Sequence, residues 1–139
     1  MDLGRSDFDS ELEANVVLDN IENTIKCLKK WMKDVPVDTP ILCAPAKSRL
    51  HYDPLGVTLI ISAWNYPLFT LFEPLVSNIA AGNVALMKPS ENSPNTSRVM
   101  KRMIDDMDQD YFRAIEGDVK ISSFLTSLKF DLIAFTGGS

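Results

Sequence analysis

The stretch that decides the fold is VTLIISAWNYPLF, Val57 to Phe69. It begins with a run of apolar and β-branched residues, which is typical of a strand buried on both faces. Asn65 and Pro67 then interrupt the run, because Asn prefers turns and Pro cannot donate a hydrogen bond to a neighbouring strand. The interruption therefore marks the end of a strand, where ligands of α/β proteins meet side chains. Asn65 is a candidate site residue on this ground, and a turn cap is its alternative role.

The segments after Val57 alternate between strand-like and helix-like patterns. Strands are predicted at 57–61, 84–87, 112–115 and 131–135, and helices at 68–81, 93–107 and 119–128. Gly82-Asn83 is the expected left-handed stop of the first of these helices. Ser93-Pro94 is the expected N-cap and first residue of the second helix. Strands that alternate with helices predict an α/β fold with a parallel sheet.

The first 53 residues follow a different pattern. Apolar residues recur at spacings of two to four between Ser6 and Lys33, which predicts a long amphipathic helix that packs on the rest of the chain. These residues are Phe8, Leu12, Val16, Leu18, Ile21, Ile25, Leu28 and Met32. Four prolines between Pro36 and Pro54 predict an extended β arm. We therefore divide the chain into a helix and arm, 1–53, and the N-terminal part of an α/β domain, 54–139.

Composition excludes several kinds of protein. The chain has 139 residues, of which 45% are hydrophobic, so it can form one domain with a real core. Its net charge is −5, and its basic residues are scattered apart from Lys29, Lys30 and Lys33 on a predicted exposed helix face. This balance argues against a nucleic acid partner. Residues 54–72 carry no charge and are nearly long enough to span a membrane. A transmembrane helix there would place Asn65 and Pro67 near the bilayer midplane, so we expect no transmembrane segment.

The two cysteines, Cys27 and Cys43, have no CxxC or histidine-rich neighbourhood. We therefore expect neither a metal site nor a disulfide, and we interpret both cysteines as small packing residues. Free cysteines also suit a reducing compartment, so we expect a cytoplasmic location. The sequence also lacks G-x-G-x-x-G and the P-loop motif. Its one glycine pair after a predicted strand, in FTGGS at 135–139, is by itself more typical of a plain turn.

Three longer segments, taken together, indicate a protein family far more specifically than this glycine pair does. PLGVTLIISAWNYP (54–67), IAAGNVALMKPSENSPNTS (79–97) and FDLIAFTGGS (130–139) resemble successive signatures of the aldehyde dehydrogenase superfamily, in that family's order and approximate spacing. WNYP, together with CLKKWM at 27–32, resembles the class 3 or fatty-aldehyde branch. The resemblance covers essentially the whole chain. It implies a Rossmann-like sheet, truncated here, behind a long helix and an extended arm.

The resemblance also assigns roles to individual residues. Asn65 matches the amide that holds the substrate oxygen as it becomes an oxyanion, a task that suits a fixed neutral donor. Lys88 and Glu91 match the positions that bind the adenosine ribose of NAD or NADP. Ser62, Ala63 and Trp64 would line the cofactor cleft. Gly137, Gly138 and Ser139 would begin the phosphate-binding turn, although Gly138 stands where many relatives have serine, and Ala63 where they often have proline.

The implied parent enzyme oxidises an aldehyde to a carboxylic acid with NAD or NADP and forms a homodimer. The family's catalytic cysteine and glutamate match no position in this sequence, so we expect the 139-residue chain to be inactive alone. Two alternatives stay open. One is a non-catalytic interaction module that uses exposed apolar surface. The other is a phosphate- or nucleotide-binding α/β domain without catalysis.

Overall fold

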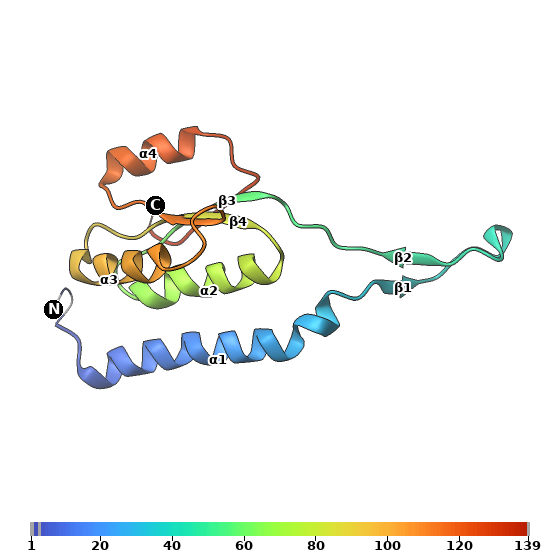
Figure 1. Ribbon diagram of the computed structural model, residues 1–139, viewed down its shortest axis with the longest axis horizontal. Coiled ribbons are helices and arrows are strands. Elements are labelled where there is room, and N and C mark those ends of the chain that lie inside the picture. The colour runs from blue at the N-terminus through green and yellow to red at the C-terminus, as the bar shows by residue number, and fades with distance from the viewer. Residues whose placement is uncertain (1, 3, 139) are drawn as a thin grey trace.

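The computed structural model describes residue 2 and residues 4–138 (Figure 1). It begins with helix α1 (Asp7–Trp31), followed by an arm made of strand β1 (Val35–Val37), the short 3₁₀ helix η1 (Ile41–Cys43) and strand β2 (Ser48–Leu50). The α/β part then comprises β3 (Val57–Ile61), α2 (Pro67–Ala80), β4 (Val84–Lys88), α3 (Pro94–Asp105), β5 (Phe112–Ala114), α4 (Val119–Ser127) and β6 (Leu132–Phe135).

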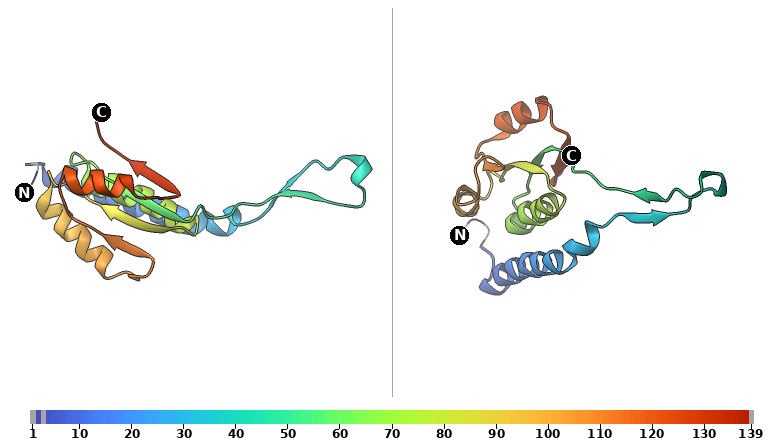
Figure 2. Two further views of the ribbon diagram at one scale, coloured as in Figure 1. Left: turned by 90° about the horizontal axis from the view of Figure 1, so that it is seen from above. Right: turned by 45° about the vertical axis from the view of Figure 1, so that its right-hand side comes forward.

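The main sheet has four strands in the order β5-β4-β3-β6, and every pairing is parallel. Helices α2 and α3 lie on one face of the sheet and α4 lies on the other, which makes three layers (Figures 1 and 2). The predicted parallel α/β fold is therefore confirmed, and each predicted strand and helix is present with ends that differ by no more than two residues.

Alternation along β3 explains why both faces of the sheet are covered. Ile60 is buried on the α2 and α3 face, where it belongs to a core cluster with Leu71 and Met87. Leu59 and Ile61 point to the other face, where they form a smaller cluster with Leu125 of α4. The sheet therefore joins two cores of unequal size, and the larger one lies under α2 and α3.

The helix ends are close to the predictions, with one difference. Gly82 has φ +78°, as expected for a left-handed stop after α2. Pro94 opens α3, but the Ser93 hydroxyl does not cap it. That hydroxyl donates to the carbonyl of Ser90 at 3.4 Å, and Asp2 from the start of the chain accepts the first amides of the helix instead. Ser93 and Pro94 are thus the N-cap and the first residue of α3, as predicted, but the Ser93 side chain makes no capping hydrogen bond.

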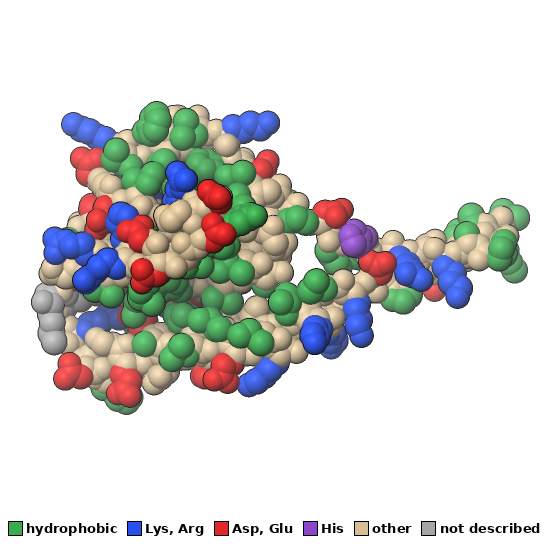
Figure 3. All heavy atoms as spheres, viewed as in Figure 1, with side chains coloured by type: hydrophobic (Ala, Val, Ile, Leu, Met, Phe, Trp, Pro, Cys, Tyr) green, Lys and Arg blue, Asp and Glu red, His purple; other side chains and the backbone are tan. Residues whose placement is uncertain are grey.

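The arm projects away from the body of the molecule (Figure 2). Its strands β1 and β2 pair antiparallel, with Val35 opposite Leu50. The tip is apolar and uncovered, since Ile41 is 89% exposed and Leu42 is 95% exposed, and Figure 3 shows hydrophobic side chains gathered there. Cys43 lies exposed at this tip, so its predicted packing role is wrong, whereas Cys27 on α1 is half-buried.

Helix α1 packs along α2, but not through the predicted apolar face. Its buried residues are Glu13, Val17 and Thr24. Most of the apolar residues expected to pack are exposed, namely Phe8, Leu12, Val16, Leu18, Ile25 and Met32. These residues are spread around the helix rather than along one stripe, so their spacing could not identify the contact face. Lys29, Lys30 and Lys33 are exposed as predicted, although Lys33 lies beyond the end of α1. Within the described part of the chain, no helix has the length and apolar character needed to cross a bilayer.

Candidate functional site

The order of the strands creates a cleft at one end of the sheet. From β3 the chain adds β4 and then β5 on one side, and β6 then pairs with β3 on the opposite side. The connections therefore reverse direction between β3 and β6, and ligands of open α/β sheets bind outside the strand ends at such a point. An open cleft of about 660 Å³, here called the β3–β6 cleft, lies there.

The structure brings together the residues that the sequence singled out. The lining of the β3–β6 cleft includes Ser62, Ala63, Trp64, Asn65, Lys88, Glu91, Gly137 and Gly138. They come from three separate strand ends, because they follow or terminate β3, β4 and β6. Ser139, the last predicted site residue, lies outside the described residues. The β3–β6 cleft is therefore the candidate functional site, because the other predicted residues all line it.

Lys88 and Glu91 form the main charged feature of the cleft. The Lys88 ammonium lies 2.5 Å from Oε2 of Glu91, and only 2% of the lysine side chain is exposed, against 41% for the glutamate. The hydrogen bond from Lys88 holds the pKa of Glu91 below its usual range. Lys88 also fixes the neighbouring strand end, because its carbonyl accepts from the backbone amide of Ser62 at 3.2 Å. The pair offers a donor and an acceptor side by side.

Ser62 contributes a polar group that the protein itself does not satisfy. Its Oγ is buried, yet it has no hydrogen-bond partner among the described residues. Buried hydroxyls are nearly always paired, and those that are not call for an explanation such as an absent ligand. Ser62 lines the same cleft as Lys88 and Glu91. The wall of the cleft therefore combines this unpaired hydroxyl with the Lys88–Glu91 pair.

The Asn65 turn, residues 63–66, connects β3 to α2. The Thr70 hydroxyl supports it from α2 by donating to the carbonyl of Tyr66 at 2.8 Å and accepting from the amide of Ala63 at 3.2 Å. Asn65 is exposed and lines the β3–β6 cleft. Its backbone carbonyl accepts a hydrogen bond from Arg5, which also lies over the ring of Tyr66. The turn thus presents an amide at a strand end on an anchored backbone.

The glycine turn after β6 forms the opposite wall of the cleft. The amide of Thr136 donates to the carbonyl of Ile61 at 3.0 Å, which ties the start of this turn to β3. A Cβ added at Gly138 would meet nothing within 4 Å, so the space above it is open. Neither Gly137 nor Gly138 has a positive φ. Gly138 therefore leaves room for a ligand, whereas a Cβ at Gly137 would lie 2.6 Å from the Phe135 ring.

The cleft also contains residues that the sequence did not point to. They are Ile61, Ser90, Asn92, Val119, Ser122, Phe135 and Thr136. Val119 and Ser122 come from the first turns of α4, on the opposite face of the sheet from α2. The hydrophobic periodicity of the sequence predicts that α4 exists but not which strand end it covers. No sequence pattern therefore identified Val119 and Ser122 as cleft residues. Ser90, Asn92 and Thr136 lie beside predicted residues, and that proximity was the available signal.

A doubly wound parallel sheet with a polar cleft at its switch point is the architecture of nucleotide-binding α/β proteins. The chain belongs to the aldehyde dehydrogenase family, whose model matches residues 1–139.

Curated relatives agree with this assignment. The 4,4'-diaponeurosporen-aldehyde dehydrogenase of Staphylococcus aureus is 43% identical over 138 residues, which cover 98% of this chain and 30% of the relative. Aldehyde dehydrogenase family 3 member H1 of Arabidopsis thaliana is 36% identical over 140 residues, which cover 99% of this chain and 29% of the relative. The name of this second relative places it in aldehyde dehydrogenase family 3, which agrees with the resemblance of WNYP to the class 3 branch. The chain spans about 30% of the length of these relatives.

Solved structures show the same fold. The substrate-bound state of Staphylococcus aureus AldH is 43% identical and superposes with a TM-score of 0.84, covering 87% of this chain and 27% of that one. Succinic semialdehyde dehydrogenase from Streptococcus pyogenes, solved in complex with NADP+, gives a TM-score of 0.80 over 95% of this chain and 29% of that one. At 14% identity the second likeness concerns the fold alone.

Proposed function

We propose that this chain supplies the cofactor-binding cleft and the oxyanion donor of an NAD- or NADP-dependent aldehyde dehydrogenase, which oxidises an aldehyde to a carboxylic acid. The observation that carries the proposal is the polar set in the β3–β6 cleft: the Lys88–Glu91 pair beside the unpaired, buried Oγ of Ser62. Family membership and the position of the cleft at the switch point support it.

The residues present fit a dinucleotide. Lys88 donates one hydrogen to Glu91 and has two more for a ribose hydroxyl, while the ionised Glu91 can accept from a second hydroxyl. Ser62 Oγ lies buried in the same cleft and can pair with a polar atom of the ligand. The open side of Gly138 leaves space beside the backbone for a phosphate. The dinucleotide, when bound, supplies the hydride acceptor for the oxidation.

Asn65 acts on the aldehyde. When a nucleophile attacks the carbonyl carbon, negative charge develops on the oxygen, and a fixed N–H donor at that oxygen stabilises the charge. The Asn65 side chain is a neutral donor on an anchored turn that lines the cleft. The nucleophile is not Cys27 or Cys43, since Cys27 lies on α1, Cys43 lies at the arm tip, and neither lines the β3–β6 cleft.

The test uses a chimera in which residues 1–139 replace the matching segment of the Staphylococcus aureus relative. Reduced cofactor is followed by absorbance with aliphatic and aromatic aldehydes and with NAD or NADP. Asn65→Ala should lower kcat by roughly 10²–10³-fold and leave cofactor KM nearly unchanged. Lys88→Met should mainly raise cofactor KM. Asn15→Ala, which removes an exposed asparagine on α1, is the matched control and should change neither value.

Thermal unfolding of each variant separates catalysis from folding. If Asn65 is only a turn cap, Asn65→Ala lowers the free energy of unfolding by about 0.5–2 kcal/mol while turnover per folded molecule stays normal. That result would contradict the oxyanion assignment. A chimera that folds and binds neither cofactor would favour the non-catalytic interaction module.

A further inference from the structure

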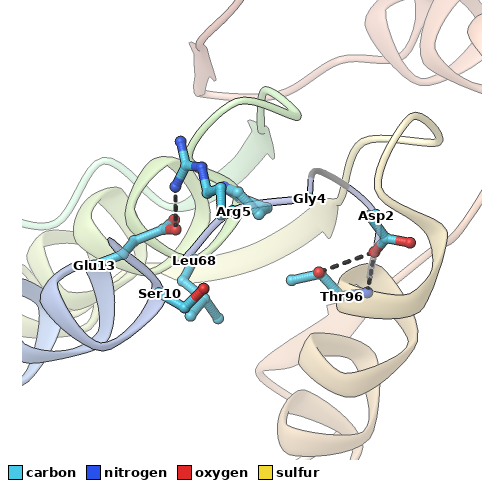
Figure 4. A pocket seen from close by; sticks show the side chains of 8 residues that line it. Asp2, Gly4, Arg5, Ser10, Glu13, Leu68 and Thr96 are labelled. Carbon is cyan, nitrogen blue, oxygen red and sulfur yellow. Dashed lines mark hydrogen bonds and ion pairs between the residues drawn. The ribbon is translucent and has the colours of Figure 1, made fainter. Parts of the chain in front are cut away.

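Two charged residues before α1 contact other parts of the molecule, and Figure 4 shows Asp2 beside Thr96 at the start of α3 and Arg5 beside Glu13 of α1. The carboxylate of Asp2 accepts from the backbone amides of Asn95 at 3.2 Å and Thr96 at 2.7 Å. Arg5 reaches the Asn65 turn. Asp2 is therefore held at a helix N-terminus, and Arg5 is held at the candidate site.

Arg5 holds the Asn65 turn through two of its residues. One guanidinium nitrogen donates to the backbone carbonyl of Asn65, and the guanidinium carbon lies 4.0 Å from the centre of the Tyr66 ring. The other terminal nitrogen pairs with Oε2 of Glu13 at 3.0 Å. A planar guanidinium can do all three at once, because its edges donate in two directions while its face stacks. Lysine has no equivalent geometry.

Glu13 gives Arg5 a fixed support. Its side chain is only 5% exposed, and while Oε2 accepts from Arg5, Oε1 accepts from the backbone amide of Phe69 at 3.0 Å. Phe69 lies in the first turn of α2, where free amides and the helix dipole favour a carboxylate. Glu13 is thus fixed to the helix that follows the Asn65 turn, and Arg5 is fixed to Glu13.

These contacts bear on Asn65 in particular. The hydrogen bonds within the turn hold Ala63 and Tyr66 to Thr70, and the bond from Arg5 is the one described bond to Asn65 itself. That bond restrains ψ of Asn65 and holds the backbone of Asn65 in place beside α1. A shift of the Cα would carry the Cβ and the side-chain amide with it. An oxyanion donor must be placed to within about 0.5 Å, so a small shift is enough to weaken it.

We propose that Arg5, supported by Glu13, is a positioning residue for catalysis that sets the direction of the Asn65 amide in the β3–β6 cleft. The inference rests on the proposed function, because it assigns Arg5 an effect through Asn65. A purely structural alternative is that Arg5 only fastens α1 to α2. The two differ in what happens when Asn65 is already removed.

The experiment is a double-mutant cycle in the chimera described above, with kcat and cofactor KM measured per folded molecule. Arg5→Ala should lower kcat by roughly 10- to 100-fold and change cofactor KM less than two-fold. In the Asn65→Ala background the same substitution should lower kcat no further. Arg5→Lys keeps the charge next to Glu13 and should recover only part of kcat. Arg102→Ala, which removes an exposed arginine on α3, is the matched control.

Two kinetic results would overturn the proposal. One is an Arg5→Ala chimera with normal kcat per folded molecule, and the other is an effect of Arg5→Ala that persists in full when Asn65 is alanine. If Asn65→Ala itself leaves kcat normal, the proposed function fails. The positioning claim is then still tested by nuclear magnetic resonance of the 139-residue chain.

In that spectrum Arg5→Ala and Glu13→Gln should each shift or broaden the side-chain amide signals of Asn65, with Arg102→Ala leaving them unchanged. Glu13→Gln keeps an acceptor for the Phe69 amide, so it weakens the arginine support without removing the contact to α2. If Arg5→Ala unfolds the chain, Arg5→Lys replaces it. Asn65 signals that are identical in all folded variants would show that Arg5 does not position this side chain.

Discussion

Lys88 and Glu91 form an ion pair whose members differ greatly in exposure, with the lysine buried and the glutamate half in solvent. Glu91→Gln leaves a buried ammonium without its carboxylate and should lower the free energy of unfolding by about 1–3 kcal/mol. Lys88→Met removes the charge itself, leaves a carboxylate that water can solvate, and should cost less. Chemical denaturation of both variants measures the difference.

The exposed pair Lys101–Asp105 is the control, since Asp105→Asn should change the free energy of unfolding by only about 0.2–0.5 kcal/mol. A larger loss for Lys88→Met than for Glu91→Gln would contradict the prediction.

Ser62→Ala should have opposite effects on stability and on binding. The buried Oγ has no protein partner among the described residues, so its removal should leave the free energy of unfolding unchanged or raise it by up to about 1 kcal/mol. If the hydroxyl pairs with the cofactor, the Kd for NAD or NADP in the chimera should rise by about 2- to 10-fold. Calorimetric titration and thermal unfolding test the two effects. Ser123→Ala, at an exposed position on α4, is the control, and an unchanged Kd for Ser62→Ala would remove Ser62 from the cofactor site.

The arm should be sensitive to pH through His51. Nδ1 of His51 lies 2.6 Å from Asp34, and Nε2 lies 3.4 Å from Asp53. The hydrogen bond to Asp34 and the charges of Asp53 and Asp34 raise the pKa of His51 above 6.5. The hydrogen bond with His51, together with Arg49, lowers the pKa of Asp34 below 3.8.

A raised histidine pKa contributes stability that is fully present below pH 6.5 and is lost as the pH rises through the raised value. A lowered aspartate pKa contributes stability that is present above pH 3.8 and is lost as the pH falls through the lowered value. Pairing of β1 with β2 should therefore be tightest between these limits. Amide exchange in the two strands, corrected for intrinsic rates and compared with His51→Gln, measures this. If amide protection in β1 and β2 is the same in the native chain and in His51→Gln at every pH, this prediction is contradicted.

Gly56→Ala should be among the most damaging single changes before β3. Gly56 has φ +122°, and a Cβ there would lie 2.4 Å from Oδ2 of Asp131, the atom that accepts from the amide of Val57. Strain and clash together should lower the free energy of unfolding by about 1–3 kcal/mol, as measured by denaturant midpoints. Asp131→Ala in the same chain should relieve the clash but not the strain. Gly138→Ala is the control with open space around it, and an equal loss there would refute this explanation.

The α/β part of the fold could be predicted from the sequence because its signals are local. Apolar runs such as 57–61, the stop at Gly82 and Pro94 at the start of α3 each act over a few residues, and the structure confirms them. The convergence of Asn65, Lys88 and Gly137 on one cleft followed from the parallel arrangement, since the same ends of parallel strands share an edge. Their assigned roles, and the division of the chain after residue 53, stay predictions.

The contacts of the N-terminal helix could not be predicted in this way. The face of α1 that packs on α2 contains Glu13 and Thr24, and the apolar spacing of the helix did not identify it. Glu13 is buried because the N-terminus of α2 and Arg5 both satisfy its carboxylate. Arg5 and Asn65 are 60 positions apart, and hydrophobic periodicity contains no information on a polar contact at that distance.

The position of β6 beside β3 has a consequence for how the chain is made. Val57 and Asp131, which begin this pairing, are 74 positions apart. During synthesis on the ribosome, β3 and β4 can pair early, but the other edge of β3 stays open until β6 emerges. Open apolar strand edges attract other chains, and pairings over long sequence distances form slowly. A nascent chain that pauses before Leu132 therefore presents a half-built sheet, a natural client for a chaperone.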